Sequence, residues 1–349
     1  MNREQIGREA YYIASLYHDM EVDLIKARKR YLNKPATGSW EVTKLSGVRE
    51  LEDQNGMIIS RHSNKIRRET DAAINTAYYQ QYEKIRKART DIRLAFAPNE
   101  DNIRMLQSLV YQDHRKAEFA ALRLANDQAR QTIIRAAPDY VSGKASLWTA
   151  VDNAQRDFLE KGMNAVVYSN GNHVNVASYS EMSLRSALSR TSASAQGQVM
   201  DEWGEHLIII ASLASTCPFC MPWQGKVLID DVFANGTAAE GNYHLLSEAI
   251  GENLFHPQCR HLPGSPYFPG ITSEPPTLNN EEVQERYEAE QVQRKLERAV
   301  RQDRRLAEGL LDPDEVAERK RRVRELQARV KSHVDSHAYL KRDYAREQI

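Results

Sequence analysis

Two short stretches contain every cysteine of this chain: CPFCMPWQGKV at residues 217–227 and LFHPQCRH at residues 254–261. The first holds two cysteines three residues apart, and the second holds a cysteine with a histidine on either side. Two cysteines at this spacing can face one tetrahedral metal ion, and a distant pair of Cys and His can complete its coordination. The sequence therefore predicts one structural zinc ion with these ligands: Cys217, Cys220, His256 and Cys259, with His261 as the alternative histidine.

The same cysteines are compatible with a second interpretation, in which they are reduced thiols packed in a loop-rich lobe. The second stretch offers His-x-x-Cys or Cys-x-His, which departs from a second Cys-x-x-Cys motif. A redox Cys-x-x-Cys is disfavoured because Pro222 and Gly225 indicate an irregular turn, whereas redox motifs begin a helix. Gly225-Lys226 lacks the other glycines of a phosphate-binding loop. Bound metal and packed thiols therefore both stay open.

The remaining residues of the two stretches are candidates for structural roles. We expect Trp223 to be buried, and to hold the lobe together by apolar contact if no metal is bound. We expect Arg260 to pair with a carboxylate or with backbone carbonyl groups in the fold rather than with phosphate. The full set of motif residues with an expected structural role is Trp223, Gln224, Gly225, Lys226, Pro257 and Arg260.

The composition limits the classes of protein that the chain can belong to. Its 349 residues are enough for two or three domains, and the formal net charge is zero with 28% charged residues. The mean hydropathy of −0.65 and the lack of a long apolar run predict no membrane span. The first residues have no apolar core of a secretory signal. Three clustered cysteines indicate a reducing compartment, so we expect synthesis and assembly in a cytoplasm.

The N-terminal region, residues 1–137, is predicted to be a bundle of helices. Apolar residues recur there every three or four positions, which is the period of an amphipathic helix. Breaks are expected at residues 33–39, which are rich in turn formers, and at Pro98-Asn99. A long helix is predicted from Asn102 to Ala136.

The central region, residues 138–272, is predicted to be a small α+β domain. Residues 164–176 read as a β-hairpin, because Asn170-Gly171 supplies the positive φ that a tight turn requires. Ser178 and Glu181 form a capping box that predicts the start of the next helix. Strands are expected at residues 206–212 and 227–229, and residues 235–253 are expected to form a loop that includes one helical turn. The fold class is therefore α+β and predominantly α-helical.

The C-terminal region, residues 273–349, is predicted to consist of a linker and charged helices. Gly309 ends the first of these helices, and Asp312-Pro313 begins the second as N-cap and first-turn proline. We expect a helical hairpin or a short coiled coil. The basic cluster at residues 318–324 is interpreted as a solvated helix face, because acidic residues are interleaved nearby.

The two motifs together resemble the minor capsid proteins of tailed bacteriophages, in the MuF-like head morphogenesis group. The motifs that carry the resemblance are Cys-x-x-Cys-x-x-Trp-Gln-Gly-Lys-Val and Phe-His-Pro-x-Cys-Arg-His. The resemblance extends over the whole chain, from the helical N-terminal part through the central MuF-like domain to the charged tail. It implies a structural protein of the virion, at the portal vertex inside the capsid, that is needed for head assembly, DNA packaging or DNA delivery. The implied partners are the portal protein and the major capsid or scaffolding protein, with packaged DNA as a further candidate.

Two other functions are compatible with parts of the sequence. MuF-like domains are sometimes compared with ADP-ribosyltransferases, which use a Glu-x-Glu or Gln-x-Glu motif and a Ser-Thr-Ser strand. Residues 138–270 contain neither glutamate motif, and residues 192–194 lie in a predicted helix. We therefore expect no enzymatic activity and no catalytic residues. A zinc-stabilised DNA-binding module is the other alternative, and the zero net charge gives it no support.

Overall fold

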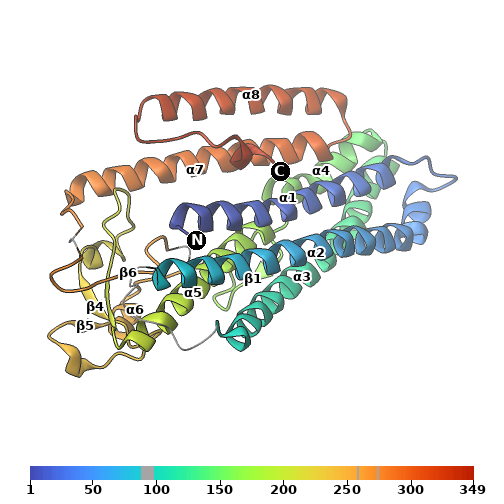
Figure 1. The fold of residues 1–349 in the computed structure, drawn as a ribbon. Helices are drawn as coiled ribbons and strands as arrows, with labels where there is room; N and C mark the ends of the chain where they lie inside the picture. The colour runs from blue at the N-terminus through green and yellow to red at the C-terminus, as the bar shows by residue number, and fades with distance from the viewer. Residues whose placement is uncertain (88–97, 258, 273–274) are drawn as a thin grey trace. The chain divides into compact units, whose positions relative to one another are not determined.

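The computed structural model describes residues 1–87, 98–257, 259–272 and 275–349. The described chain is predominantly α-helical with a few short strands, which confirms the predicted fold class (Figure 1). The α-helices are α1 (Arg3–Asn33), α2 (Trp40–Arg86), α3 (Glu100–Val141), α4 (Leu147–Lys161), α5 (Val176–Trp203), α6 (Leu246–Gly251), α7 (Asn280–Gly309) and α8 (Pro313–Asp335). The strands are β1 (Val166–Val167), β2 (His173–Val174), β3 (Leu207–Ile209), β4 (Val227–Ile229), β5 (His244–Leu245) and β6 (Ser265–Pro266). Short 3-10 helices are η1 (Met221–Trp223), η2 (Ala238–Glu240) and η3 (Tyr344–Glu347).

The chain forms two compact units, and each unit is assembled from three separate segments. Unit 1 consists of Met1–Tyr12, Arg67–Asp113 and Glu181–Glu288, and unit 2 consists of Ile13–Ile66, His114–Ser180 and Ala289–Ile349. Helices α1, α2, α3, α5 and α7 each contribute residues to both units. Across the described residues, no helix combines the length and the apolar character that crossing a membrane requires.

Unit 2 includes the predicted hairpin of charged helices. The C-terminal part of α7 and the whole of α8 run side by side in Figure 1. Asp303 of α7 accepts a hydrogen bond from Arg319 of α8 at 3.1 Å, and His333 of α8 contacts the carbonyl oxygen of Ala289 at 2.9 Å. Asp312 caps α8 as predicted, because its side chain accepts from the Asp314 amide at 2.9 Å. Both ends of the hairpin are therefore fixed by polar contacts.

The loop between α7 and α8 is tied to α4 by one buried carboxylate. Asp152 is 1% exposed, and its two oxygens accept from the Leu311 amide at 2.8 and 3.0 Å and from the Asp312 amide at 2.9 Å. Gln155 donates to the carbonyl oxygen of Gly309 at 3.0 Å. The backbone groups freed where α7 ends at Gly309 are thus satisfied by side chains of α4.

Unit 1 contains a four-stranded sheet in the order β5-β4-β3-β6. Strand β3 pairs antiparallel with β4 and with β6, and β4 pairs parallel with β5. Ile209 at the end of β3 lies opposite both Val227 and Ser265. The loop between β3 and β4 and the segment that leads into β6 therefore meet at the same end of β3. Those two segments carry the cysteines.

Helix α5 is fixed to this sheet by a buried side chain and by a close backbone contact. Gln196 donates to the carbonyl oxygen of Gly264 at 2.9 Å and accepts from Gln81 of α2 at 3.1 Å. Gly197 lies so close to Phe233 that an added Cβ would be 2.2 Å from the Phe233 carbonyl oxygen. The sheet and the segment before β6 are therefore held against α5.

The structure confirms several local predictions. The turn of the β1-β2 hairpin contains Gly171 at φ +80°, and α1 ends at Asn33. Strands β3 and β4 lie inside the two predicted strand segments. Residues 192–194 lie in α5 and not in a strand. A break was also predicted at Pro98-Asn99. Both residues precede α3 in the described structure, and residues 88–97 lie outside the described residues.

Three local predictions were wrong. Helix α5 begins at Val176 and not after Ser178, because the Asn175 side chain follows β2 directly and accepts from the Ala177 amide at 3.0 Å. Helix α3 continues past Pro138 to Val141, although a proline inside a helix removes a backbone hydrogen bond and crowds the preceding turn. Residues 235–253 contain the expected helical turn as α6, but they also contain the strand β5, which pairs with β4 and was not predicted.

Candidate metal centre

The loop that carries Cys217 and Cys220 is held at both ends by backbone hydrogen bonds. The Ile210 amide donates to the carbonyl oxygen of Lys226 at 3.0 Å, and the Gly225 amide donates to the carbonyl oxygen of Ile210 at 2.9 Å. Gly225 adopts φ +74°, a conformation that side chains with a Cβ rarely adopt, and this permits the turn back into β4. Within the loop, the Cys220 amide donates to the Cys217 carbonyl at 3.2 Å, so the two cysteines lie on one tight turn.

The second stretch forms a similar turn. The Cys259 amide donates to the carbonyl oxygen of His256 at 2.9 Å, which places these residues at the two ends of a turn. The His261 amide donates to the Cys259 sulfur at 3.3 Å. Arg3 of α1 donates to the carbonyl oxygens of His261 at 3.5 Å and of Pro263 at 3.3 Å, which holds the end of this segment.

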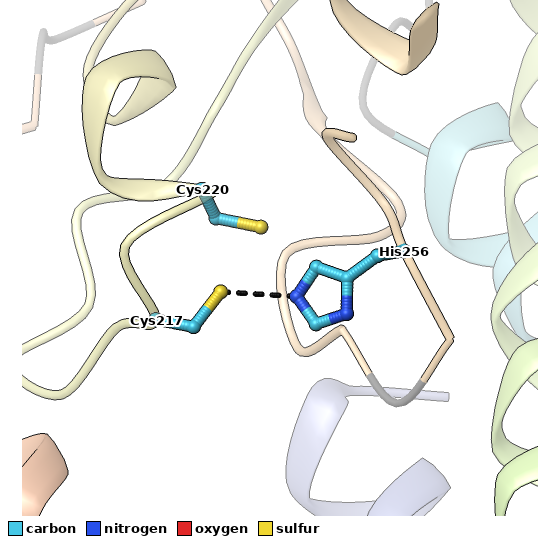
Figure 2. A group of neighbouring side chains, drawn as sticks. All are labelled: Cys217, Cys220 and His256. Carbon is cyan, nitrogen blue, oxygen red and sulfur yellow. Dashed lines mark hydrogen bonds between the residues drawn. The ribbon is translucent and has the colours of Figure 1, made fainter. Parts of the chain in front are cut away.

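The structure brings all five predicted ligand residues together. The side chains of Cys217 and His256 point toward each other (Figure 2), and the Cys217 sulfur lies 3.0 Å from His256 Nε2. The Cys220 sulfur lies 3.5 Å from the Cys259 sulfur. His261 Nδ1 lies 3.5 Å from the Cys259 sulfur. Two groups of donor atoms, each within 4.8 Å of one another, share Cys220: one adds Cys217 and His256, and the other adds Cys259 and His261. These side chains could hold a metal ion.

Burial differs among the donors. Cys220, Cys259 and His261 are buried, whereas Cys217 and His256 are partly exposed. The contact between the two buried sulfurs makes their acidities unequal. The hydrogen bond with Cys259, followed by burial, raises the pKa of the Cys220 thiol, whereas the hydrogen bond from Cys220 and the nearby His261 lower the pKa of Cys259. Cys259 is therefore the first of the pair to become a thiolate, the form that binds metal.

Each histidine presents one ring nitrogen to a sulfur and the other to an oxygen. His256 Nδ1 lies 2.8 Å from the Pro257 carbonyl oxygen, and His261 Nε2 lies 3.4 Å from Gln224 Oε1 and 3.5 Å from Thr216 Oγ1. Metal-bound histidines in proteins usually donate their second N–H to such an oxygen, which fixes the tautomer and orients the ring. The surroundings of both rings therefore fit a metal site.

The motif residues around the cysteines have identifiable contacts. Trp223 is buried, as predicted, and Lys226 Nζ lies 4.8 Å above its ring. Gln224 Oε1 accepts from the Leu213 amide at 2.5 Å and from the Thr216 hydroxyl at 2.9 Å. Arg260 donates to the Ser215 hydroxyl at 3.4 Å, within the fold.

Two residues near the centre were not found by sequence reasoning. Thr216 precedes the first cysteine directly, and its position beside the motif was the only local signal for it. Arg3 is separated from the centre by most of the chain, so only the tertiary structure could reveal its contact with the segment of His261.

The fold and the centre together define a class of protein that is mainly helical and contains one small sheet. Two cysteine-bearing turns lie at one end of that sheet and could hold a metal ion. The family model described as "Phage minor capsid protein 2" matches residues 1–335, and the chain belongs to that family. Comparison with curated proteins and with solved structures found no match.

Proposed function

We propose that this protein is a structural component of the head of a tailed phage, located at the portal vertex inside the capsid. The family match over residues 1–335 carries the proposal, because it covers the helical regions as well as the motifs. In this proposal the protein acts in head assembly, in DNA packaging or in DNA delivery, and its role is structural rather than enzymatic. It is made in the host cytoplasm and becomes part of the virion.

The three regions of the chain have separate roles in this proposal. The helical region 1–137 and the charged region 273–349 supply contacts with the portal protein and with the major capsid or scaffolding protein. Region 138–272 carries the metal centre, in the part of the region that belongs to unit 1. Many of the exposed side chains of α8 are charged, and charged surfaces suit interfaces that form and rearrange during assembly.

The experiment that tests the proposal is an analysis of purified virions and of assembly intermediates. We expect the protein to be found in mature heads in few copies per particle and to co-purify with the portal protein from infected cells. Phage lacking the gene are expected to give empty or non-infectious heads. Absence from purified virions, together with no association with the portal protein, would refute the proposal.

Contact with packaged DNA is the part of the proposal that depends on α8. Arg319 and Arg322 pair with the buried Asp303, although the Arg322 side chain is itself exposed; Lys320 and Arg324 are exposed as well. If Lys320 and Arg324 bind phosphate, replacing both with Gln should weaken binding of duplex DNA and reduce its salt dependence by about two counterions. An unchanged salt dependence would exclude α8 as a DNA contact.

We also propose that the centre binds one structural zinc ion. The ligands are Cys217, Cys220 and Cys259 together with one histidine, His256 or His261. Thiolate and imidazole donors favour zinc over Mg²⁺ or Ca²⁺, which prefer oxygen ligands. The support from the structure is that all the donors converge and that both imidazole rings are oriented by oxygen acceptors. Zinc would link the turn of residues 217–220 to the segment of residues 256–261.

A further inference from the structure

A buried arginine of unit 2 lines a small internal cavity. Arg28 of α1 is 4% exposed, and the cavity has a volume of about 10 Å³. Asn55 of α2, Ala125 of α3 and Phe158 of α4 also line it, so the cavity lies among four helices of the same unit. A cavity of this volume has room for one particle of about the size of a water molecule, which excludes phosphate, sulfate and organic ligands.

One edge of the Arg28 guanidinium group has no acceptor among the residues that the structure describes. Its Nε and Nη2 atoms are both buried and unpaired. The ring of Phe158 lies 4.2 Å from the central carbon of the group and covers its flat face, not this edge. In the same unit, Arg342 uses the corresponding edge to bind both carboxylate oxygens of Glu347 at 2.6 and 2.9 Å, and Arg305 uses it to bind two backbone carbonyl oxygens, both at 3.1 Å. The edge of Arg28 is therefore a preformed pair of donors.

The charges around the cavity leave that of Arg28 unbalanced. Burial lowers the pKa of Arg28 to about 9, so the guanidinium group still carries its charge at neutral pH. Glu21 is the one acidic residue in the described wall of the cavity. Burial disfavours its carboxylate, but the charge of Arg305 and nearby hydrogen bonds hold the pKa of Glu21 below the ordinary value, so Arg305 is its counter-ion. One positive charge is left over, and a buried charge without a partner is costly.

The Asn55 amide is the other polar group of the cavity with an unpaired atom. Its Nδ2 donates to Asn126 Oδ1 at 2.9 Å, and its Oδ1 is buried without a partner among the described residues. If both amides turn over, the hydrogen bond between them is kept with donor and acceptor exchanged, and Asn55 then presents an N–H to the cavity. An anion in the cavity favours that orientation, because it accepts from this N–H as well as from Arg28.

We propose that this cavity is a halide site, which holds one chloride ion between Nε and Nη2 of Arg28 and the amide of Asn55. A monatomic anion supplies the single negative charge that Arg28 lacks, and it fits where an oxyanion does not. Met163 in the cavity wall has a flexible thioether side chain, which can adjust to an ion somewhat larger than water. The ion links α1 to α2 and stabilises unit 2, independently of the metal centre in unit 1.

The test is urea unfolding of the full-length protein at constant ionic strength, with chloride replaced stepwise by gluconate, an anion too large for the cavity. Above the dissociation constant, a tenfold rise in chloride should lower the unfolding equilibrium constant by up to about tenfold, because the ion binds only the folded state. Arg28→Met should abolish the difference between the two salts. The control is Arg30→Met, at an exposed position of the same helix, which should retain it.

Asn55→Asp tests the site even if Arg28→Met does not fold. The new carboxylate lies in the wall of the same cavity and takes the place of the ion, so this variant should fold and be equally stable in chloride and gluconate. Crystals of the wild type grown in bromide should show an anomalous scattering peak beside Nε and Nη2 of Arg28. Equal stability of the wild type in the two salts, or a bromide crystal without a peak at Arg28, would overturn the proposal and make the occupant an ordinary water molecule.

Discussion

Replacing Gly197 by alanine should destabilise the protein, although the same change in most helices is stabilising. Gly197 lies inside α5, where alanine is favoured over glycine by up to about 1 kcal/mol. At this position, however, the new Cβ would lie 2.2 Å from the carbonyl oxygen of Phe233 and 2.4 Å from its carbonyl carbon. Both are backbone atoms, so no side-chain rotation can relieve the clash. The turn that follows β4 would have to move away from α5.

The magnitude follows from the two opposing terms. Overpacking of a tight contact costs about 1–3 kcal/mol, and a clash of more than 1 Å with backbone belongs at the upper end of that range. After subtracting the gain in helix propensity, we expect Gly197→Ala to lower the free energy of unfolding by about 2 kcal/mol. The control is Gly56→Ala in α2, where no atom lies within 4 Å of the new Cβ, and which should raise the free energy of unfolding by about 0.5–1 kcal/mol.

The two variants are compared with the wild type by urea unfolding, followed by circular dichroism. A shift of the midpoint to lower urea for Gly197→Ala and to higher urea for Gly56→Ala is the expected pattern. If Gly197→Ala is as stable as Gly56→Ala, then α5 is not held as closely to the segment after β4 as described. Helix α5 would then contribute less to holding the sheet beside the two cysteine-bearing segments.

Three other perturbations test separate parts of the structure. Burial raises the pKa of Asp230 from 3.8 to about 6, because the folded protein disfavours the charged carboxylate. The free energy of unfolding should therefore fall by up to about 3 kcal/mol as the pH rises from about 4 to above 6. Asp230→Asn keeps the oxygen that accepts from Phe233, so it should flatten this pH dependence in urea unfolding, and an unchanged slope would contradict the assignment. Asp152→Ala leaves the amides of Leu311 and Asp312 without their acceptor and should lower the free energy of unfolding by about 2–4 kcal/mol in the same assay. Asp152→Asn retains one acceptor oxygen and should lower it by less. Equal losses for the two variants would count against the role of these hydrogen bonds. Chelation of zinc should lower the thermal midpoint of the wild type but not that of Cys220→Ser, whereas equal shifts would show that the effect does not arise at the proposed site.

The helical part of the fold could be predicted because its signals are local. The spacing of apolar residues and the cap at Asp312 each act within a few residues of chain. The same holds for the hairpin turn at Asn170-Gly171. Local signals failed where two of them competed. Asn175 and Ser178 are both good N-caps, and the start of α5 was decided by the end of β2, which brings the chain to Asn175 first.

The short strands illustrate what local pattern cannot predict. Strands β5 and β6 have two residues each, too few for an alternation of apolar and polar positions to be visible. Each exists because a partner strand is already in place: β4 for β5, and β3 for β6. Pairing between segments so far apart in the sequence depends on the tertiary structure, which also explains why the contact of Gln224 with His261 was not apparent from the motif.

The donors of the metal centre were found more easily than the strands, because cysteine and histidine are scarce and their chemistry restricts what a cluster can do. The sequence left the two histidines as alternatives, because their spacing from Cys259 suits either one. Burial and hydrogen bonding separate them: His261 is buried against Gln224, whereas His256 is partly exposed. The distinction depends on residues 213–224, which no spacing rule relates to residue 261.

A metal ion at this centre would stabilise the part of unit 1 that contains the short strands and the two cysteine-bearing segments. Strands β3 and β4 have three residues each and form only a few ladder hydrogen bonds, each contributing about 1 kcal/mol. Apolar burial of Ile208, Leu228 and Ile229 holds the sheet in place, and the connections beside it bury only a few large apolar side chains, namely Trp223, Leu254 and Leu262. Structural zinc contributes about 10–16 kcal/mol in small peptides, enough to order both connections at once. Removing the proposed ion should therefore loosen the turn of Cys217 and Cys220 and the segment of Cys259 and His261 more than the paired strands β3 and β4, because the sheet is also held against α5.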